Sequence, residues 1–163
     1  MVAFNGNEFK VLVVEDNQHF RLLIKTVLQA LGIREVEEAV NGLDAIDCLK
    51  KFQADLVIAD WKMAPMDGIE FTHFIRKDNA SPNPYLPVIM VTGFAEAKLV
   101  VEARDAGVNE FLAKPISAKM LMSRILAVVQ KPRPFVKAGQ YFGPDRRRKP
   151  LPFKGDDRRK KLQ

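Results

Sequence analysis

The 163-residue sequence contains a single cysteine, Cys48, so a disulfide within the chain is excluded. Because a single cysteine fits a reducing environment, the protein is expected in a reducing compartment. The apolar runs are short and interrupted by charged residues, and none is long enough to cross a bilayer. The first ten residues, MVAFNGNEFK, lack the basic start, long apolar stretch and cleavage site of a secretory signal. These absences predict a soluble, cytoplasmic protein with no membrane partner.

Acidic residues are scarce at the C-terminal end of the chain. The formal net charge is +6, but residues 131–163 carry +9 and residues 1–130 carry −3. A hydrophobic content of 47% is enough to build a core, so the chain is not of the disordered class. We therefore expect a folded, mildly acidic domain over residues 1–130 and a basic Pro/Arg-rich tail over residues 131–163. Electrostatic arguments about partners apply to the tail.

Short apolar runs rich in β-branched residues alternate with stretches of helical periodicity in the first 130 residues. Strands are expected at residues 10–15, 34–40, 55–59, 86–91 and 108–112. Asn17 and Ser117 are candidate N-caps for the first and last helices. Nearly continuous apolar strands are typical of a parallel sheet that is covered on both faces. The pattern therefore predicts a doubly wound α/β fold with a five-stranded parallel sheet.

Polar side chains follow four of the five expected strands. Glu15 and Asp16 end the first strand, Asp60 the third and Thr92 the fourth, while the fifth runs into Lys114. Because the carboxyl ends of parallel strands meet at one edge of the sheet, these side chains are expected to share a small pocket. Three neighbouring carboxylates repel one another unless a cation neutralises them, and oxygen ligands favour a hard ion such as Mg²⁺.

This set of residues predicts phosphoryl chemistry. A carboxylate beside a metal ion can attack phosphorus and hold the group as an aspartyl phosphate. No histidine or cysteine belongs to the set, so a Ser-His or Cys-His mechanism lacks its base. Phosphatases of the haloacid dehalogenase type also use a strand-end aspartate with Mg²⁺. They need a second aspartate two residues further on, where this chain has Lys62, and that activity is disfavoured.

Four motifs, VVEDN, IADWKMAPMDG, VTG and FLAKP, occur in this order and each follows its expected strand. Together they resemble the receiver domain of bacterial two-component response regulators over roughly residues 8–130. The resemblance implies a flavodoxin-like (βα)5 fold with strand order 2-1-3-4-5. It also implies a signalling protein rather than an enzyme, one that catalyses only its own phosphotransfer and autodephosphorylation.

The resemblance implies a role for each residue of the set. Asp60 is the phosphoacceptor, which takes the phosphoryl group from the phosphohistidine of a sensor histidine kinase or phosphotransfer protein. Thr92 and Lys114 bind the phosphoryl group. Mg²⁺ is held by Asp60 and by three further groups, namely the carboxylates of Glu15 and Asp16 and the backbone carbonyl of Lys62.

The resemblance also implies a switch and an output surface. Thr92 senses the phosphoryl group, and Phe111 occupies the aromatic position that rotates inward on activation. The Lys114-Pro115 peptide is expected to be cis. A downstream protein is expected to bind the surface of the fourth and fifth strand–helix units. One departure from the family pattern is Ala64, where many relatives have proline, with Pro65 one place later.

The tail contains a repeated Gly-x-Asp-Arg-Arg element, at residues 143–147 and 155–159. Its prolines and charges predict neither a continuous helix nor a core strand. Arginine pairs can form forked hydrogen bonds with carboxylates or phosphates, which makes the paired arginines candidate recognition residues: Arg146, Arg147, Arg158 and Arg159. Three alternatives stay open, namely docking of a protein partner, a nucleic-acid-binding arm gated by the receiver, and a solvated tail. The tail can also fold back and place arginines near the carboxylates.

Overall fold

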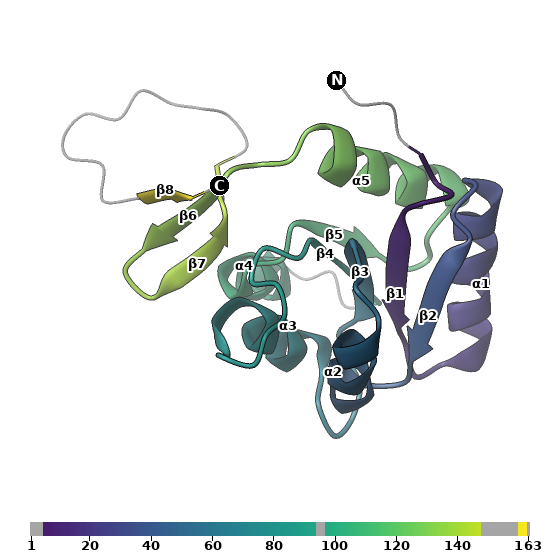
Figure 1. Ribbon diagram of the computed structural model, residues 1–163, viewed down its shortest axis with the longest axis horizontal. Coiled ribbons are helices and arrows are strands. Elements are labelled where there is room, and N and C mark those ends of the chain that lie inside the picture. The colour runs from purple at the N-terminus through teal and green to yellow at the C-terminus, as the bar shows by residue number, and fades with distance from the viewer. Residues whose placement is uncertain (1–4, 94–96, 148–159, 163) are drawn as a thin grey trace.

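The structure is a computed structural model that describes residues 5–93, 97–147 and 160–162. Five parallel strands form a central sheet in the order β2-β1-β3-β4-β5 (Figure 1). The predicted fold class and strand order are therefore confirmed. The strands are β1 (Lys10–Val14), β2 (Glu35–Ala39), β3 (Leu56–Asp60), β4 (Val88–Thr92) and β5 (Glu110–Ala113).

Helices cover both faces of this sheet, as the apolar strands require. Side chains of α1 and α5 share one buried cluster with one face of the strands, and those of α2, α3 and α4 share a second cluster with the other face. In the described part of the chain, no helix combines the length and apolar character needed to span a bilayer. The helices are α1 (Gln18–Ala30), α2 (Gly42–Lys51), α3 (Gly68–Lys77), α4 (Ala97–Ala106) and α5 (Ala118–Gln130).

Local sequence signals set the helix starts. The side chains of Asn17 and Ser117 accept hydrogen bonds from backbone N–H groups in the first turns of α1 and α5, as predicted. At α3, Asp67 and Glu70 form a reciprocal capping box. Each cap satisfies donors that a helix start leaves without partners, so the first turn of each of these helices is stabilised.

The C-terminal segment contains strands, and the prediction of no core strand there was wrong. β6 (Phe135–Ala138) and β7 (Tyr141–Pro144) form an antiparallel hairpin, and β8 (Lys160–Leu162) pairs with the other edge of β6. The turn between β6 and β7 contains Gly139, whose φ of 61° suits a residue without a side chain. Prolines are tolerated because Pro134 precedes β6 and Pro144 ends β7.

The hairpin packs beside α3 and α4 (Figure 1). Phe135 is buried, and its ring lies 5.2 Å from that of Tyr85 and 5.6 Å from that of Phe142 between centroids. Rings at such separations stabilise one another beyond the burial of their area. The hairpin therefore belongs to the packed body of the protein rather than to a solvated tail.

Two of the four candidate recognition arginines have described positions. Arg146 forms an ion pair of 3.0 Å with Asp105 near the end of α4, and Arg147 lies 3.5 Å from Asp145. The carboxyl end of α4 lies at the amino ends of the strands, opposite the edge where Asp60 stands. The expectation that the tail brings arginines to the carboxylates is therefore wrong for Arg146 and Arg147. The other two, Arg158 and Arg159, lie outside the described residues.

We predict that Gly143→Ala destabilises the protein. A Cβ at this position would come within 2.9 Å of the Gly107 Cα and 2.7 Å of the Tyr141 hydroxyl oxygen, so the hairpin must shift away from the loop before β5. The free energy of unfolding from urea titration should fall by about 1–3 kcal/mol. In the control Gly93→Ala, where a Cβ meets nothing within 4 Å, it should change by less than about 0.5 kcal/mol. Equal effects of the two substitutions would contradict tight hairpin packing.

Candidate functional site

Three carboxylates gather at the carboxyl ends of β1 and β3. These strands are parallel neighbours, with Val14 paired to Ala59, so the residues that follow each pair emerge side by side. Glu15, Asp16 and Asp60 each offer a carboxylate oxygen, and these oxygens all lie within 4.8 Å of one another. The structure thus brings together three acids that are up to 45 positions apart in sequence.

Lys114 supplies the positive charge at this cluster. It follows β5, and its Nζ lies 3.5 Å from Glu15 Oε2 and 3.6 Å from Asp60 Oδ1. The same Nζ lies 3.9 Å from the centroid of the Phe20 ring at the start of α1. The peptide bond between Lys114 and Pro115 is cis, as the resemblance implied, and so is that between Ala64 and Pro65. One lysine therefore faces two of the three carboxylates.

Burial makes the charged form of this cluster costly. Glu15 is 1% exposed and Asp60 is 8% exposed, whereas Asp16 lies in contact with solvent. Desolvation, reinforced by the negative charge of Asp60, raises the pKa of Glu15 to about 7 despite the nearby Lys114. Burial also raises the pKa of Asp60, and the charge of Lys114 opposes this shift. The site therefore favours any added cation.

The donor set fits a hard divalent cation. Among the described residues, Glu15 Oε2 is a buried carboxylate oxygen with no hydrogen-bond partner. Such an oxygen gains a partner when a cation binds, and all three acids offer only oxygen atoms as ligands. Lys62 lies in the loop just after Asp60, and its side chain is exposed. The acidic cluster can therefore hold a metal ion of the class that includes Mg²⁺.

Thr92 and Phe111 lie on the two strands beyond β3. Thr92 ends β4 and is fully buried, and the residue before it pairs with Asp60 in the sheet. It therefore stands at the same sheet edge as the carboxylates. Phe111 lies within β5, is half-buried and packs against the core cluster on the side of α4. It is not a member of the carboxylate cluster.

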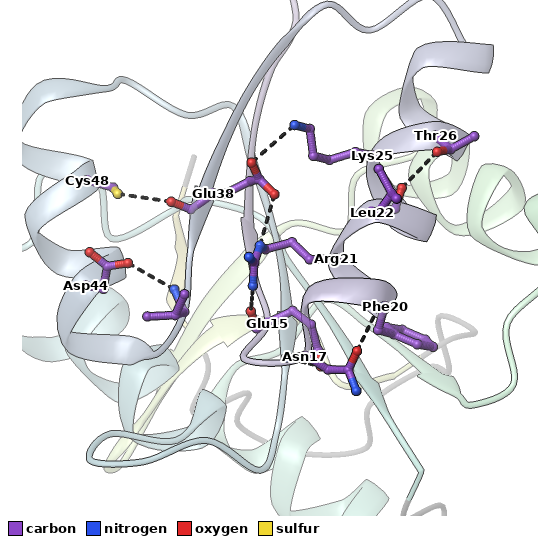
Figure 2. Close-up of polar contacts among 11 residues, drawn as sticks. Glu15, Asn17, Phe20, Arg21, Leu22, Lys25, Thr26, Glu38, Asp44 and Cys48 are labelled. Carbon is purple, nitrogen blue, oxygen red and sulfur yellow. Dashed lines mark hydrogen bonds and ion pairs between the residues drawn. The ribbon is translucent and has the colours of Figure 1, made fainter.

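Two supporting residues escaped prediction. Arg21 of α1 donates a 2.8 Å hydrogen bond to the backbone carbonyl of Glu15 and pairs with Glu38 of β2 at 2.9 Å (Figure 2). It thereby fixes the backbone that carries Glu15. Gly68 lies so close to Asp60 that a Cβ would stand 2.3 Å from the Asp60 carbonyl oxygen. The Asp-Gly pair that closes the IADWKMAPMDG motif is a sequence signal that could have identified Gly68. The residues next to Arg21 in the sequence do not indicate that it contacts Glu15 and Glu38.

Comparison with known proteins agrees with this fold. The response regulator receiver domain family matches residues 11–126. Chemotaxis protein CheY-3 of Vibrio cholerae is 35% identical over 131 residues, which cover 80% of this chain and 99% of that protein. Chemotaxis protein CheY of Pseudomonas aeruginosa is 34% identical over 122 residues, 75% of this chain and 97% of that protein. The solved structure of CheY4 of Vibrio cholerae superposes with a TM-score of 0.67 at 29% identity, covering 75% and 99% of the two chains.

A parallel (βα)5 sheet with an acidic cluster and a lysine at its carboxyl edge defines the receiver class, and the chain belongs to the response regulator receiver domain family. Within that class it is a two-component response regulator, homologous to the CheY chemotaxis proteins. Its family acts in signalling rather than in metabolic catalysis.

We predict that metal-free protein loses stability as the pH rises from about 4.5 to about 7. Glu15 binds its proton more tightly in the folded state, with a pKa of about 7 against an ordinary glutamate value of 4.5. In this window the folded state therefore holds more protons than the unfolded state, and the free energy of unfolding falls with rising pH. The expected loss is about 1–3 kcal/mol, measured by urea titration in the presence of a chelator.

Glu15→Gln should flatten this pH dependence, because the amide does not titrate. The exposed Glu8→Gln is the matched control and should leave the slope unchanged. A slope that is the same in Glu15→Gln as in the wild type would show that another group causes it.

Proposed function

We propose that Asp60 accepts a phosphoryl group from the phosphohistidine of a sensor histidine kinase or of a phosphotransfer protein. One observation carries the proposal. Asp60 is the buried, strand-end member of three clustered carboxylates and also lies 3.6 Å from the Lys114 ammonium. This combination of a desolvated carboxylate, oxygen ligands for a cation and a fixed positive charge suits attack on phosphorus.

Transfer forms one bond and breaks one bond. An oxygen of the Asp60 carboxylate bonds to phosphorus while the bond between phosphorus and the donor imidazole nitrogen breaks, and the imidazole leaves with the bonding electrons. Mg²⁺, when bound by Glu15, Asp16, Asp60 and the Lys62 carbonyl, neutralises charge on the carboxylates and on the phosphoryl oxygens. Lys114 pairs with the phosphoryl oxygens, and Thr92 donates its hydroxyl hydrogen to one of them.

The phosphoryl group then shifts a conformational equilibrium. It favours the arrangement in which Thr92 and Lys114 contact it, by no more than the difference in contact energy between the two arrangements. Phe111, half-buried beside α4, changes its orientation together with Thr92. The surface of α4 and β5 thereby changes for a downstream protein. Arg146 is already paired with Asp105 of α4, so the described part of the tail up to residue 147 acts at α4 as part of the folded body.

We predict that acetyl phosphate with Mg²⁺ adds one phosphoryl group to the wild-type protein, read by intact mass. Asp60→Asn should remove the adduct, because the amide oxygen is a poor nucleophile. Asp47→Asn is the matched control, since Asp47 is exposed on α2 away from the cluster, and it should be phosphorylated like the wild type. An adduct of equal yield in Asp60→Asn would place the acceptor elsewhere.

We predict that Asp16→Asn weakens Mg²⁺ binding about tenfold or more, because it removes one anionic ligand from the cluster. Trp61, the one tryptophan of the chain, follows Asp60 directly and is buried, so its fluorescence reports on the site during a Mg²⁺ titration. Since Asp16 is exposed, the free energy of unfolding of the metal-free protein should hardly change. Unaltered Mg²⁺ affinity in Asp16→Asn would exclude Asp16 as a ligand.

A further inference from the structure

A hollow with a cavity volume of about 460 Å³ lies between the end of α3 and the turn of the β6–β7 hairpin. It is far from the carboxylate cluster in the fold, because the end of α3 and the hairpin lie beyond the amino ends of the strands. Within the described part of the chain, no acidic residue lines the hollow. Its walls are Arg76, Lys77, Lys137, Gly139, Gln140 and Phe142.

Arg76 contributes a buried charge that no carboxylate of the described residues neutralises. Its side chain is 4% exposed, and its guanidinium donates hydrogen bonds to neutral acceptors only: the carbonyl oxygens of Pro84, Leu86 and Gly107 and the Asn109 side-chain oxygen. Desolvation lowers the pKa of Arg76 to about 9, so the group is still protonated at neutral pH. The hydrogen bonds satisfy its donors, but the positive charge remains and acts strongly through a low-dielectric surrounding.

Two lysines add to this charge at the mouth of the hollow. Lys77 and Lys137 are exposed, and within the described ranges neither forms an ion pair. Both ammonium groups are therefore available to an anion that enters the hollow.

We propose that this hollow docks a short acidic segment of a partner protein, whose carboxylates pair with Lys77 and Lys137 under the field of Arg76. Gln140 offers an amide that can hydrogen-bond to the segment, and the half-buried Phe142 gives the hollow an apolar wall. Pairing of carboxylates with unpaired lysines in a hollow gives specificity for charge as well as position. This proposal goes beyond phosphoryl transfer and does not depend on it.

Two observations favour an acidic protein segment over a nucleic acid. The aromatic rings near the hollow pack against one another, with 5.5 Å between the centroids of Tyr85 and Phe142, and are therefore committed to the protein rather than to stacking on bases. Residues 1–130 carry a net charge of −3. A nucleic acid has a charge at every phosphate, so a strand extending beyond the hollow would meet this acidic body, whereas a short segment is confined to the hollow.

The test is fluorescence anisotropy with the full chain and a labelled ten-residue peptide of alternating Glu and Gly. The peptide with Gln in place of every Glu is the neutral probe. Binding of the acidic peptide at low salt is expected, with at least about tenfold weaker binding of the Gln peptide. Binding of both peptides with equal affinity, or of neither, overturns the proposal.

Variants locate the contact. Lys77→Gln with Lys137→Gln should weaken binding of the acidic peptide about tenfold, while the matched double substitution Lys51→Gln with Lys119→Gln should leave it within twofold. All four lysines are exposed, so both variants are expected to keep the wild-type thermal midpoint. Equal affinities of the two variants overturn the assignment to the hollow. A labelled single-stranded DNA with the same number of charges, if it binds more tightly than the peptide, overturns the choice of partner.

Discussion

The mutual repulsion of Glu15, Asp16 and Asp60 is the constraint on which the working end of this molecule depends. Two of these acids are buried at the ends of neighbouring strands, where water cannot screen them. Lys114 offsets part of the repulsion. Arg21 fixes the backbone of Glu15 in place, although the carboxylate of that residue lies in an unfavourable position. A site assembled in this way responds strongly to a cation or to a phosphoryl group, because either one changes the balance of charge.

The surrounding structure holds these acids together against their repulsion. Asn17 caps α1 directly after Asp16, Asp67 caps α3 seven residues after Asp60, and Gly68 allows the α3 start to lie against the Asp60 backbone. Short connections of this kind leave the acids little freedom to move apart. The cost of holding them is met by the packed sheet below, whose central strands are buried throughout.

The sheet and the members of the carboxylate cluster were predictable from the sequence because both depend on local patterns. Apolar runs define the strands, and parallel strands place their ends at one edge whatever the loops do. Arg21 could not be found in this way, since its partners are Glu15, just after β1, and Glu38 of β2, which are recognisable only once those strands are adjacent. The hairpin was missed because the prolines and charges of the tail argue against strands, although the prolines lie at the ends of β6 and β7.

Arg76 has a further consequence for the limits of the folding unit. The family match ends at residue 126, but the Phe135 ring lies 4.9 Å from the Arg76 guanidinium carbon and closes the site in which that charge is buried. Arg76 in turn joins the loops before β4 and β5 by hydrogen bonds. β4, β5 and the C-terminal hairpin are thus joined through one desolvated cation, the Arg76 guanidinium. They are expected to open and close as a single cooperative unit in hydrogen exchange, although only part of that unit belongs to the common family domain.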